Sequence, residues 1–311
     1  MNLLYIGVCR EHLENHYPLY HPGQFMASHF SAEELIARVR DDNIDVLMVD
    51  VIHLAFDRAL LRQLRGQIRQ INFLYQSVSS LVDLEEAHHC GILVTKLPDD
   101  VYCNEVAEFV IAQLLCACKG MIKFDASMRG GTWNQAITTN QSLRGKTLGV
   151  VGFGHIGRRI IQLCSTWDMR LLVSKRDCSN HPMTDNATCV ELQVLLEESD
   201  FVALAVPLTQ ETRGLLNSEN IERMKHNAIL INVSRGDIVD ESAVSNALLT
   251  GRLGYYCADV FSQEPLAQGH PFLSNESTIL SPHVAWSTEG TLKKSFHIWS
   301  NQVLPTGRDA S

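Results

Sequence analysis

The chain has 311 residues, 45% of them hydrophobic and 20% charged, and a net charge of −9. These values are typical of a globular protein of about two domains. They argue against a nucleic-acid partner, because no basic stripe is present to neutralise phosphates. The longest apolar helical stretch, 106–118, is too short to cross a bilayer, and no export signal is visible. We therefore expect a cytoplasmic protein with no membrane partner.

The nine cysteines include no C-x-x-C pair. His88, His89 and Cys90 form a cluster, but it lacks the second ligand pair of a structural zinc site. We expect no metal site, and we interpret the cysteines as reduced thiols that serve as small apolar residues.

The first hundred residues alternate between short apolar runs and helical patterns. Ser31 and Glu34 have the spacing of a capping box at a helix start. This region predicts a small α/β domain without a phosphate-binding turn. Its expected strands are 3–8, 45–50, 73–78 and 92–97.

A helix is expected at 104–121, and a stricter rhythm follows it. Near-continuous apolar strands alternating with helices, such as 189–198 and 241–250, indicate a parallel sheet covered on both faces. The expected strands are 147–151, 169–174, 201–206, 228–233, 255–260 and 277–281. We predict an α/β protein: a Rossmann-type doubly wound parallel sheet at 101–283, plus a smaller flavodoxin-like substrate domain formed by 1–100 and 284–311.

The most informative motif is a G-x-G-x-x-G turn that directly follows the strand 147–151 and opens a helix. Its three glycines allow a tight turn, close approach to a pyrophosphate and close helix–strand packing. The helix start adds free N–H groups and a positive dipole end. We expect dinucleotide binding at Gly152, Phe153, Gly154, His155, Ile156 and Gly157.

Polar residues follow the later strands, at the sheet edge where ligands bind in such folds. An arginine, a carboxylate and a histidine come together there without being neighbours in sequence. This trio suits hydride transfer to a carbonyl: the histidine donates a proton, the carboxylate orients it, and the arginine grips the substrate. Taken singly, each residue has an ordinary interpretation as a surface cation, a turn residue or a loop residue. The set comprises Arg235, Glu264 and His283.

At this point the sequence resembles the D-isomer-specific 2-hydroxyacid dehydrogenase family. The similar segments are 148–157, 207–217, 224–241, 259–266 and 281–286. The resemblance implies Arg235 as substrate binder, His283 as acid/base, Glu264 as its partner, and Asp259 as a contact of the nicotinamide amide. Residues 129–133 resemble a segment near the family's dimer interface, so we expect a homodimer. We assign further cofactor contacts to Pro207, Thr212 and Val233.

The second strand ends differently from that of the NAD enzymes in this family, which carry an acidic residue there for the ribose hydroxyls. Here that position is Lys175, between Ser174 and Arg176, and Asp177 lies two positions late. A hydroxyl and two cations would bind a 2′-phosphate. We therefore predict a preference for NADP(H), with NAD(H) as the alternative if the basic turn is merely solvated.

The expected substrate loop, 77–81, also departs from the family, because it contains no glycine. We predict substrate contacts at Val78, Ser79, Ser80, Arg235 and Trp286.

These residues predict an NADPH-dependent reductase of a small 2-ketoacid such as glyoxylate or hydroxypyruvate. One alternative is an enzyme acting on another small anion, phosphite or a phosphonate-bearing ketoacid. A second is a dinucleotide-sensing interaction module, as in the corepressor relatives of the family.

Overall fold

A computed structural model describes residues 2–7, 24–26, 30–50, 54–76, 78, 81–133, 135, 140–178 and 186–302. The chain divides into two compact units. Unit 1 comprises Met1–Val101 and Thr288–Ser311, and unit 2 comprises Tyr102–Ser287. Among the described residues, no helix is long and apolar enough to cross a membrane.

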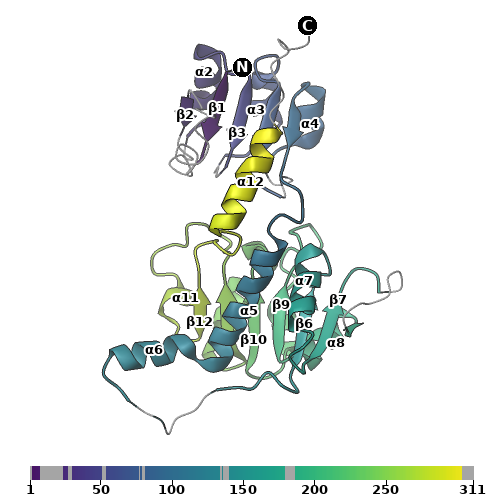
Figure 1. The fold of residues 1–311 in the computed structure, drawn as a ribbon, viewed down its shortest axis with the longest axis vertical. Coiled ribbons are helices and arrows are strands. Elements are labelled where there is room, and N and C mark those ends of the chain that lie inside the picture. The colour runs from purple at the N-terminus through teal and green to yellow at the C-terminus, as the bar shows by residue number, and fades with distance from the viewer. Residues whose placement is uncertain are drawn as a thin grey trace. The chain divides into compact units, whose positions relative to one another are not determined.

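Unit 1 is built on a parallel sheet that has five strands within its described residues, in the order β2-β1-β3-β4-β5 (Figure 1). This 2-1-3-4-5 order is that of flavodoxin-like folds. The capping box is present: Glu34 N–H donates to Ser31 Oγ, and Ser31 N–H donates to the Glu34 carboxylate. The elements are β1 (Leu3–Ile6), β2 (Gln24–Met26), α2 (Ala32–Asp41), β3 (Val46–Val49), α3 (Arg58–Leu64), β4 (Gln70–Phe73), α4 (Leu84–His89), β5 (Leu93–Thr95) and α12 (Glu289–Asn301).

The C-terminal helix α12 belongs to unit 1 because paired polar contacts hold it to β4. Trp299 Nε1–H donates to Asn72 O over 2.9 Å, and Asn72 Nδ2–H donates to Trp299 O over 2.7 Å. These contacts explain an error in our strand prediction. The strand lies at Gln70–Phe73 rather than 73–78, since its polar residues are buried against the returning chain.

Unit 2 contains a parallel sheet that has seven strands in its described part, in the order β12-β11-β10-β9-β6-β7-β8. The order in which strands are added to the sheet reverses between β6 and β9, as in a Rossmann fold with one added strand. This arrangement confirms the predicted fold class. The strands are β6 (Thr147–Val151), β7 (Arg170–Ser174), β8 (Ala187–Cys189), β9 (Phe201–Leu204), β10 (Ala228–Asn232), β11 (Leu253–Ala258) and β12 (Thr278–Leu280).

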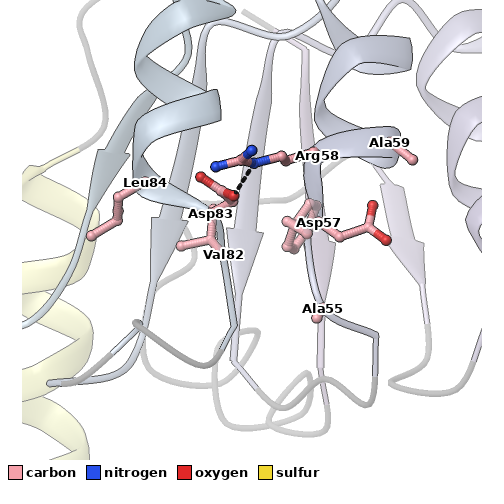
Figure 2. Close-up of a pocket in the computed structure, with 8 residues that line it drawn as sticks. Ala55, Asp57, Arg58, Ala59, Val82, Asp83 and Leu84 are labelled. Carbon is pink, nitrogen blue, oxygen red and sulfur yellow. Dashed lines mark hydrogen bonds and ion pairs between the residues drawn. The ribbon is translucent and has the colours of Figure 1, made fainter. Parts of the chain in front are cut away.

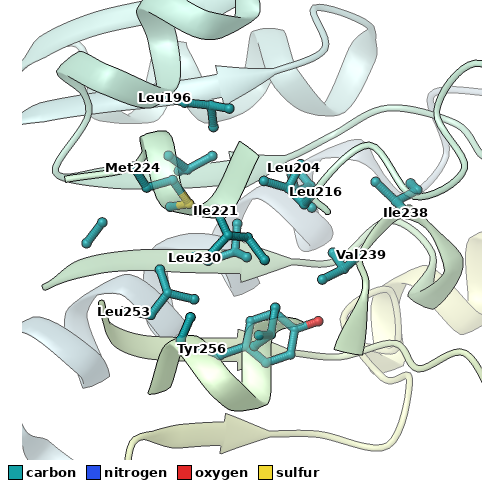
Figure 3. Packing of buried hydrophobic residues seen from close by; sticks show 14 of the residues in the cluster. Leu196, Leu204, Leu216, Ile221, Met224, Leu230, Ile238, Val239, Leu253 and Tyr256 are labelled. Carbon is teal, nitrogen blue, oxygen red and sulfur yellow. The ribbon is translucent and has the colours of Figure 1, made fainter. Parts of the chain in front are cut away.

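Two groups of helices cover this sheet. The first group, α5 and α7, packs together and against the central strands (Figure 1). The second group, α8, α9 and α10, contributes to a core that contains Leu196, Ile221, Leu230 and Tyr256 (Figure 3). The helices are α5 (Cys103–Lys119), α6 (Met121–Arg129), α7 (His155–Cys164), α8 (Leu192–Glu198), α9 (Ser218–Arg223), the 3-10 turn η1 (Gly236–Ile238), α10 (Glu241–Leu249) and α11 (Pro271–Ser274).

Two strands, the edge strand β2 of unit 1 and the edge strand β8 of unit 2, were missed in the sequence. Ala187–Cys189 forms the edge strand β8, and the helix expected at 189–198 begins only at Leu192. Three residues carry too little periodicity to reveal a strand, so only the pairing of Val173 with Cys189 identifies it.

Candidate active site

The glycine turn after β6 has no room for side chains at two positions. Gly152 has a φ of +102°, and a Cβ there would lie 2.3 Å from Ala205 O. A Cβ on Gly157 would lie 2.1 Å from Gly152 O. At Gly154, by contrast, a Cβ would meet open space. Two glycines are therefore required by packing, and the third leaves the turn accessible to a ligand.

The first turn of α7 fits a phosphate group. Its N-cap is Gly154, so no side chain bonds to the first N–H groups of the helix. His155 is exposed and Ile156 half-buried, whereas Phe153 is buried beneath the Arg158 guanidinium, which lies 4.9 Å from the ring centroid. An open helix N-terminus beside a strand end is the site at which dinucleotide pyrophosphates bind.

The basic segment after β7 lies beside this turn. Ser174 O accepts a hydrogen bond of 2.8 Å from Gly152 N–H, and the Ser174 side chain is buried. Lys175 Nζ lies 6.0 Å from the centroid of the Phe153 ring, within cation–π range. Arg176 is exposed, and its charge adds to the hydrogen bond from Thr209 in lowering the pKa of Glu211. Lys175 thus lies next to the glycine turn, and Arg176 lies near Glu211 of the loop after β9.

A disulfide closes the far end of this basic segment. Cys178 is bonded to Cys189, with 5.7 Å between their Cα atoms. The expectation that all cysteines are reduced thiols is wrong for this pair. The two residues are 11 apart in sequence, and only the pairing of β7 with β8 brings them together. Among the described cysteines, the others are free thiols.

The loop after β9 is stabilised by hydrogen bonds of its own threonine hydroxyl groups. Thr212 Oγ1–H donates to Pro207 O over 2.6 Å, and Thr209 N–H donates to Thr212 Oγ1 over 2.7 Å. Arg213 forms an ion pair with Asp237 of η1. These contacts fix Pro207 and Thr212 at the carboxyl edge of the sheet, where we predict cofactor contacts.

Arg235 is held in a turn directly after β10. Asn232, which is fully buried, donates from Nδ2 to Arg235 O and accepts at Oδ1 from Ser234 N–H, both at 3.0 Å. Ser234 Oγ–H donates to Leu204 O and thereby joins the ends of β10 and β9. The backbone of Arg235 is therefore rigid, and its guanidinium is half-buried near Glu264. Val233 is buried beside it.

Glu264 and His283 form a close pair. His283 Nδ1 lies 2.7 Å from Glu264 Oε2, and Glu264 Oε1 accepts from Phe261 N–H over 2.9 Å. Burial disfavours the charged form of Glu264, but the His283 contact, the Phe261 N–H and the Arg235 charge outweigh it and lower its pKa. Because the carboxylate is ionised, it accepts the Nδ1–H, which leaves Nε2 to exchange a proton with a substrate.

Asp259 fixes the loop that carries His283. Its buried carboxylate accepts hydrogen bonds of 2.6–2.9 Å from Ser281 Oγ–H, Val284 N–H and Ala285 N–H. Its backbone O accepts from His283 N–H over 2.8 Å. His283 has a φ of +56°, which the surrounding bonds impose. The sequence points to Asp259 only as a cofactor contact, and its structural role in this loop was not predicted.

The predicted substrate contacts fall in both units. In unit 2, the Trp286 ring lies 5.2 Å from the Tyr102 ring, centroid to centroid. In unit 1, Val78 is buried in the hydrophobic core, and its O accepts from Leu81 N–H. Ser79 and Ser80 lie outside the described residues.

A pocket in unit 1 contains none of the predicted site residues. It is lined by residues at the starts of α3 and α4, including Ala55, Asp57, Arg58 and Asp83 (Figure 2). Arg58 Nε–H donates to Asp83 over 2.8 Å, and Asp83 also caps α4 by accepting from Glu86 N–H. The charged groups of this pocket therefore bond to each other or to helix ends.

The sequence model of the D-isomer specific 2-hydroxyacid dehydrogenase NAD-binding domain matches residues 111–285. The chain belongs to this dehydrogenase family. As a member, it is an oxidoreductase that uses a nicotinamide dinucleotide, and the glycine turn and open helix end of unit 2 fit that cofactor.

Similar proteins and a similar solved structure cover most of the chain. The chain is 35% identical to a glyoxylate reductase of Thermofilum pendens over 265 residues, which are 83% of the chain and 76% of the relative. It is 37% identical to a glyoxylate reductase of Korarchaeum cryptofilum, over 72% of the chain and 68% of the relative. A crystal structure of a Thermus thermophilus protein superposes with a TM-score of 0.82 at 28% identity, covering 96% of this chain and 94% of that one.

Proposed function

We propose that this dehydrogenase reduces a small 2-ketoacid, glyoxylate or hydroxypyruvate, to the D-2-hydroxyacid with NADPH. The observation that carries the proposal is the 2.7 Å contact between His283 and Glu264, with the charge of Arg235 nearby. The glyoxylate reductases among its relatives support the choice of substrate class.

Each residue of the trio has a defined task in this reaction. When bound, NADPH supplies the hydride that reaches the carbonyl carbon. Arg235 holds the substrate carboxylate and carbonyl oxygen by charge-assisted hydrogen bonds. His283 gives its Nε2 proton to that oxygen as negative charge develops there, and Glu264 stabilises the imidazolium beforehand. The imidazole then regains a proton from water, and the hydroxyacid leaves.

The test is oxidation of NADPH, followed by absorbance, with a panel of substrates. Glyoxylate and hydroxypyruvate should react faster than pyruvate or larger 2-ketoacids. Phosphite with NADP⁺, and a phosphonate-bearing ketoacid with NADPH, test the other proposed anions. Turnover of phosphite but of no 2-ketoacid would contradict the proposal, and the absence of any turnover would favour the dinucleotide-sensing alternative.

We propose that Lys175 and Arg176 select NADPH by binding its 2′-phosphate. Replacing both with alanine should lower kcat/KM for NADPH by about 10²- to 10⁴-fold, since each of the two charge-assisted contacts contributes about 1.5–3 kcal/mol. The kcat/KM for NADH should change by less than about three-fold, because NADH has no 2′-phosphate. Steady-state kinetics with both cofactors measure the two ratios.

Arg170 provides the matched control for this substitution. It lies at the opposite end of β7 and pairs with Glu198, so Arg170→Ala should leave the cofactor ratio unchanged. Wild-type enzyme that prefers NADH would overturn the assignment of NADPH.

We also propose that the enzyme is a homodimer joined through α6. Within its described residues this helix buries none of its side chains in unit 2, and it extends from the end of α5 beyond the sheet (Figure 1). Apolar side chains are exposed along it and just after it: Met121 55%, Ile122 55%, Met128 52% and Trp133 72%. An exposed apolar cluster of this kind marks an interface.

Replacing Ile122 and Met128 with aspartate should convert the dimer to monomers, since two carboxylates would have to be desolvated in the interface. Size-exclusion chromatography with light scattering measures the mass. Leu249→Asp is the control, because Leu249 is a single exposed leucine at the end of α10. A wild-type protein with the mass of one chain would rule out this dimer.

A further inference from the structure

The loop that carries Glu264 begins where β11 ends and reaches to the start of α11. The Glu264 side chain is 36% exposed, so packing alone does not fix its position. The loop is instead fixed through Phe261 and Ser262. A Cβ on Gly236 would lie 1.9 Å from Phe261 C and 2.1 Å from Ser262 N, so η1 packs directly against the backbone of this loop.

On α10, the side chain of Glu241 bonds to Ser262 of this loop and lies near His270. Its Oε1 accepts from Ser262 N–H over 2.8 Å, and its Oε2 accepts from Ser262 Oγ–H over 2.6 Å. At the other end of the loop, His270 Nε2 lies 3.6 Å from Glu241 Oε2. His270 Nδ1 accepts from Phe272 N–H, so the neutral ring carries its proton on Nε2, towards Glu241.

Glu241 is itself held firmly. It occupies the first turn of a helix whose N-cap, Asp240, accepts from Ser242 N–H and Ala243 N–H. Its side chain is only 14% exposed. A carboxylate in a first helical turn is also favoured by the helix dipole. Glu241 therefore joins a rigid helix to an otherwise exposed catalytic loop.

We propose that Glu241 is a positioning residue that sets the geometry of the Glu264–His283 pair. Its effect passes from Ser262 to the adjacent Phe261, whose N–H bonds to Glu264 Oε1, and from Glu264 Oε2 to His283. This effect does not require a direct contact between Glu241 and His283. The inference rests on the proposed reductase function, since it assigns Glu241 a role through that catalytic pair.

The test is a double-mutant cycle on the full-length enzyme with NADPH and glyoxylate. Glu241→Ala should lower kcat by about ten-fold. A catalytic group misplaced by about 1 Å costs about 100-fold in rate, and the released loop should shift the Glu264 carboxylate by a fraction of that distance. KM for NADPH should stay within about two-fold, since the cofactor turn is elsewhere on the sheet edge. In a Glu264→Gln background, the same substitution should lower kcat by less than about two-fold.

Two more variants make the readout independent of folding. Ser262→Ala removes only the hydroxyl contact and should give a smaller decrease in kcat, which also disappears in the Glu264→Gln background. Glu241→Gln keeps an acceptor for Ser262 N–H and should restore part of the activity. Glu219→Ala is the matched control, because Glu219 also lies in the first turn of a helix, α9, and pairs with Arg223.

The outcomes separate the two proposals. If Glu241→Ala and Ser262→Ala both keep wild-type kcat, the positioning role is wrong and the catalytic pair stands. If Glu241→Ala is equally harmful in both backgrounds, Glu241 acts independently of Glu264, and the inference fails. If Glu264→Gln has no effect on an active reductase, the proposed catalytic pair itself fails, and the inference fails with it.

Discussion

Replacing His283 with glutamine should lower kcat for 2-ketoacid reduction by about 10²- to 10⁴-fold, the range for loss of a general acid. Glutamine keeps a side chain of similar length, and its amide can still donate to Glu264. It cannot deliver a proton to an oxygen that becomes an alkoxide as hydride arrives. The loss should therefore fall on kcat, whereas the Kd of NADPH, measured by fluorescence titration, should change by less than about three-fold.

Deuterium at the transferred position of NADPH supplies a second readout. In the His283→Gln enzyme the chemical step should limit the rate, so the isotope effect on kcat should be larger than in wild type. His226→Gln is the matched control. His226 is an exposed histidine of the same unit, just before the amino end of β10, opposite the edge where His283 lies. A His283→Gln enzyme that retains more than about a tenth of wild-type kcat would contradict the assignment of His283 as the acid.

The pH dependence has a defined sign. Reduction of the ketoacid consumes one proton and oxidation of the hydroxyacid releases one, so the two directions should respond to pH with opposite signs. The pKa of Glu264 is lowered, so its carboxylate stays charged when pH falls below the usual range for a glutamate. The interaction that stabilises the folded pair is thus present above the unfolded-state pKa of Glu264 and is lost as pH falls through the folded-state value.

The positions of the trio could be predicted because parallel sheets place successive strand ends at one edge. Arg235 follows β10, and His283 follows β12, so a correct strand order is enough to bring them together. The glycine turn could also be predicted from the sequence. Gly152 and Gly157 are positions where any Cβ would collide with backbone oxygen, and such positions impose glycine on the sequence itself.

The missed features depend on contacts between distant residues. Gln70 and Asn72 suggest a solvated segment, yet both are fully buried in β4 because they bond to residues of the returning C-terminal chain. Glu241 resembles an ordinary acidic residue in a first helical turn until Ser262 is placed against it. Such contacts cannot be found from local periodicity, because the partner is far away in sequence and carries no complementary pattern.

Replacing Arg235 with alanine should lower kcat/KM for glyoxylate by about 10²- to 10³-fold or more, since one donor to a developing oxyanion contributes about that factor. Arg235→Lys tests the geometry. Lysine keeps the charge but lacks the planar fork, so it should recover KM for the substrate better than kcat.

The turn that holds Arg235 explains why this loss should not come from unfolding. The Asn232 side chain fixes this turn through Arg235 O and Ser234 N–H, and the guanidinium donates to Ser234 O over 2.7 Å within the same turn. Arg235→Ala should therefore melt close to wild type, whereas Arg223→Ala, the control on α9, should keep full activity because its guanidinium pairs with Glu219 and Glu197 near the opposite edge. If Arg235→Ala lowered KM and kcat together, the guanidinium would be straining the bound substrate rather than gripping it, and the role proposed for it in the ground state would be wrong.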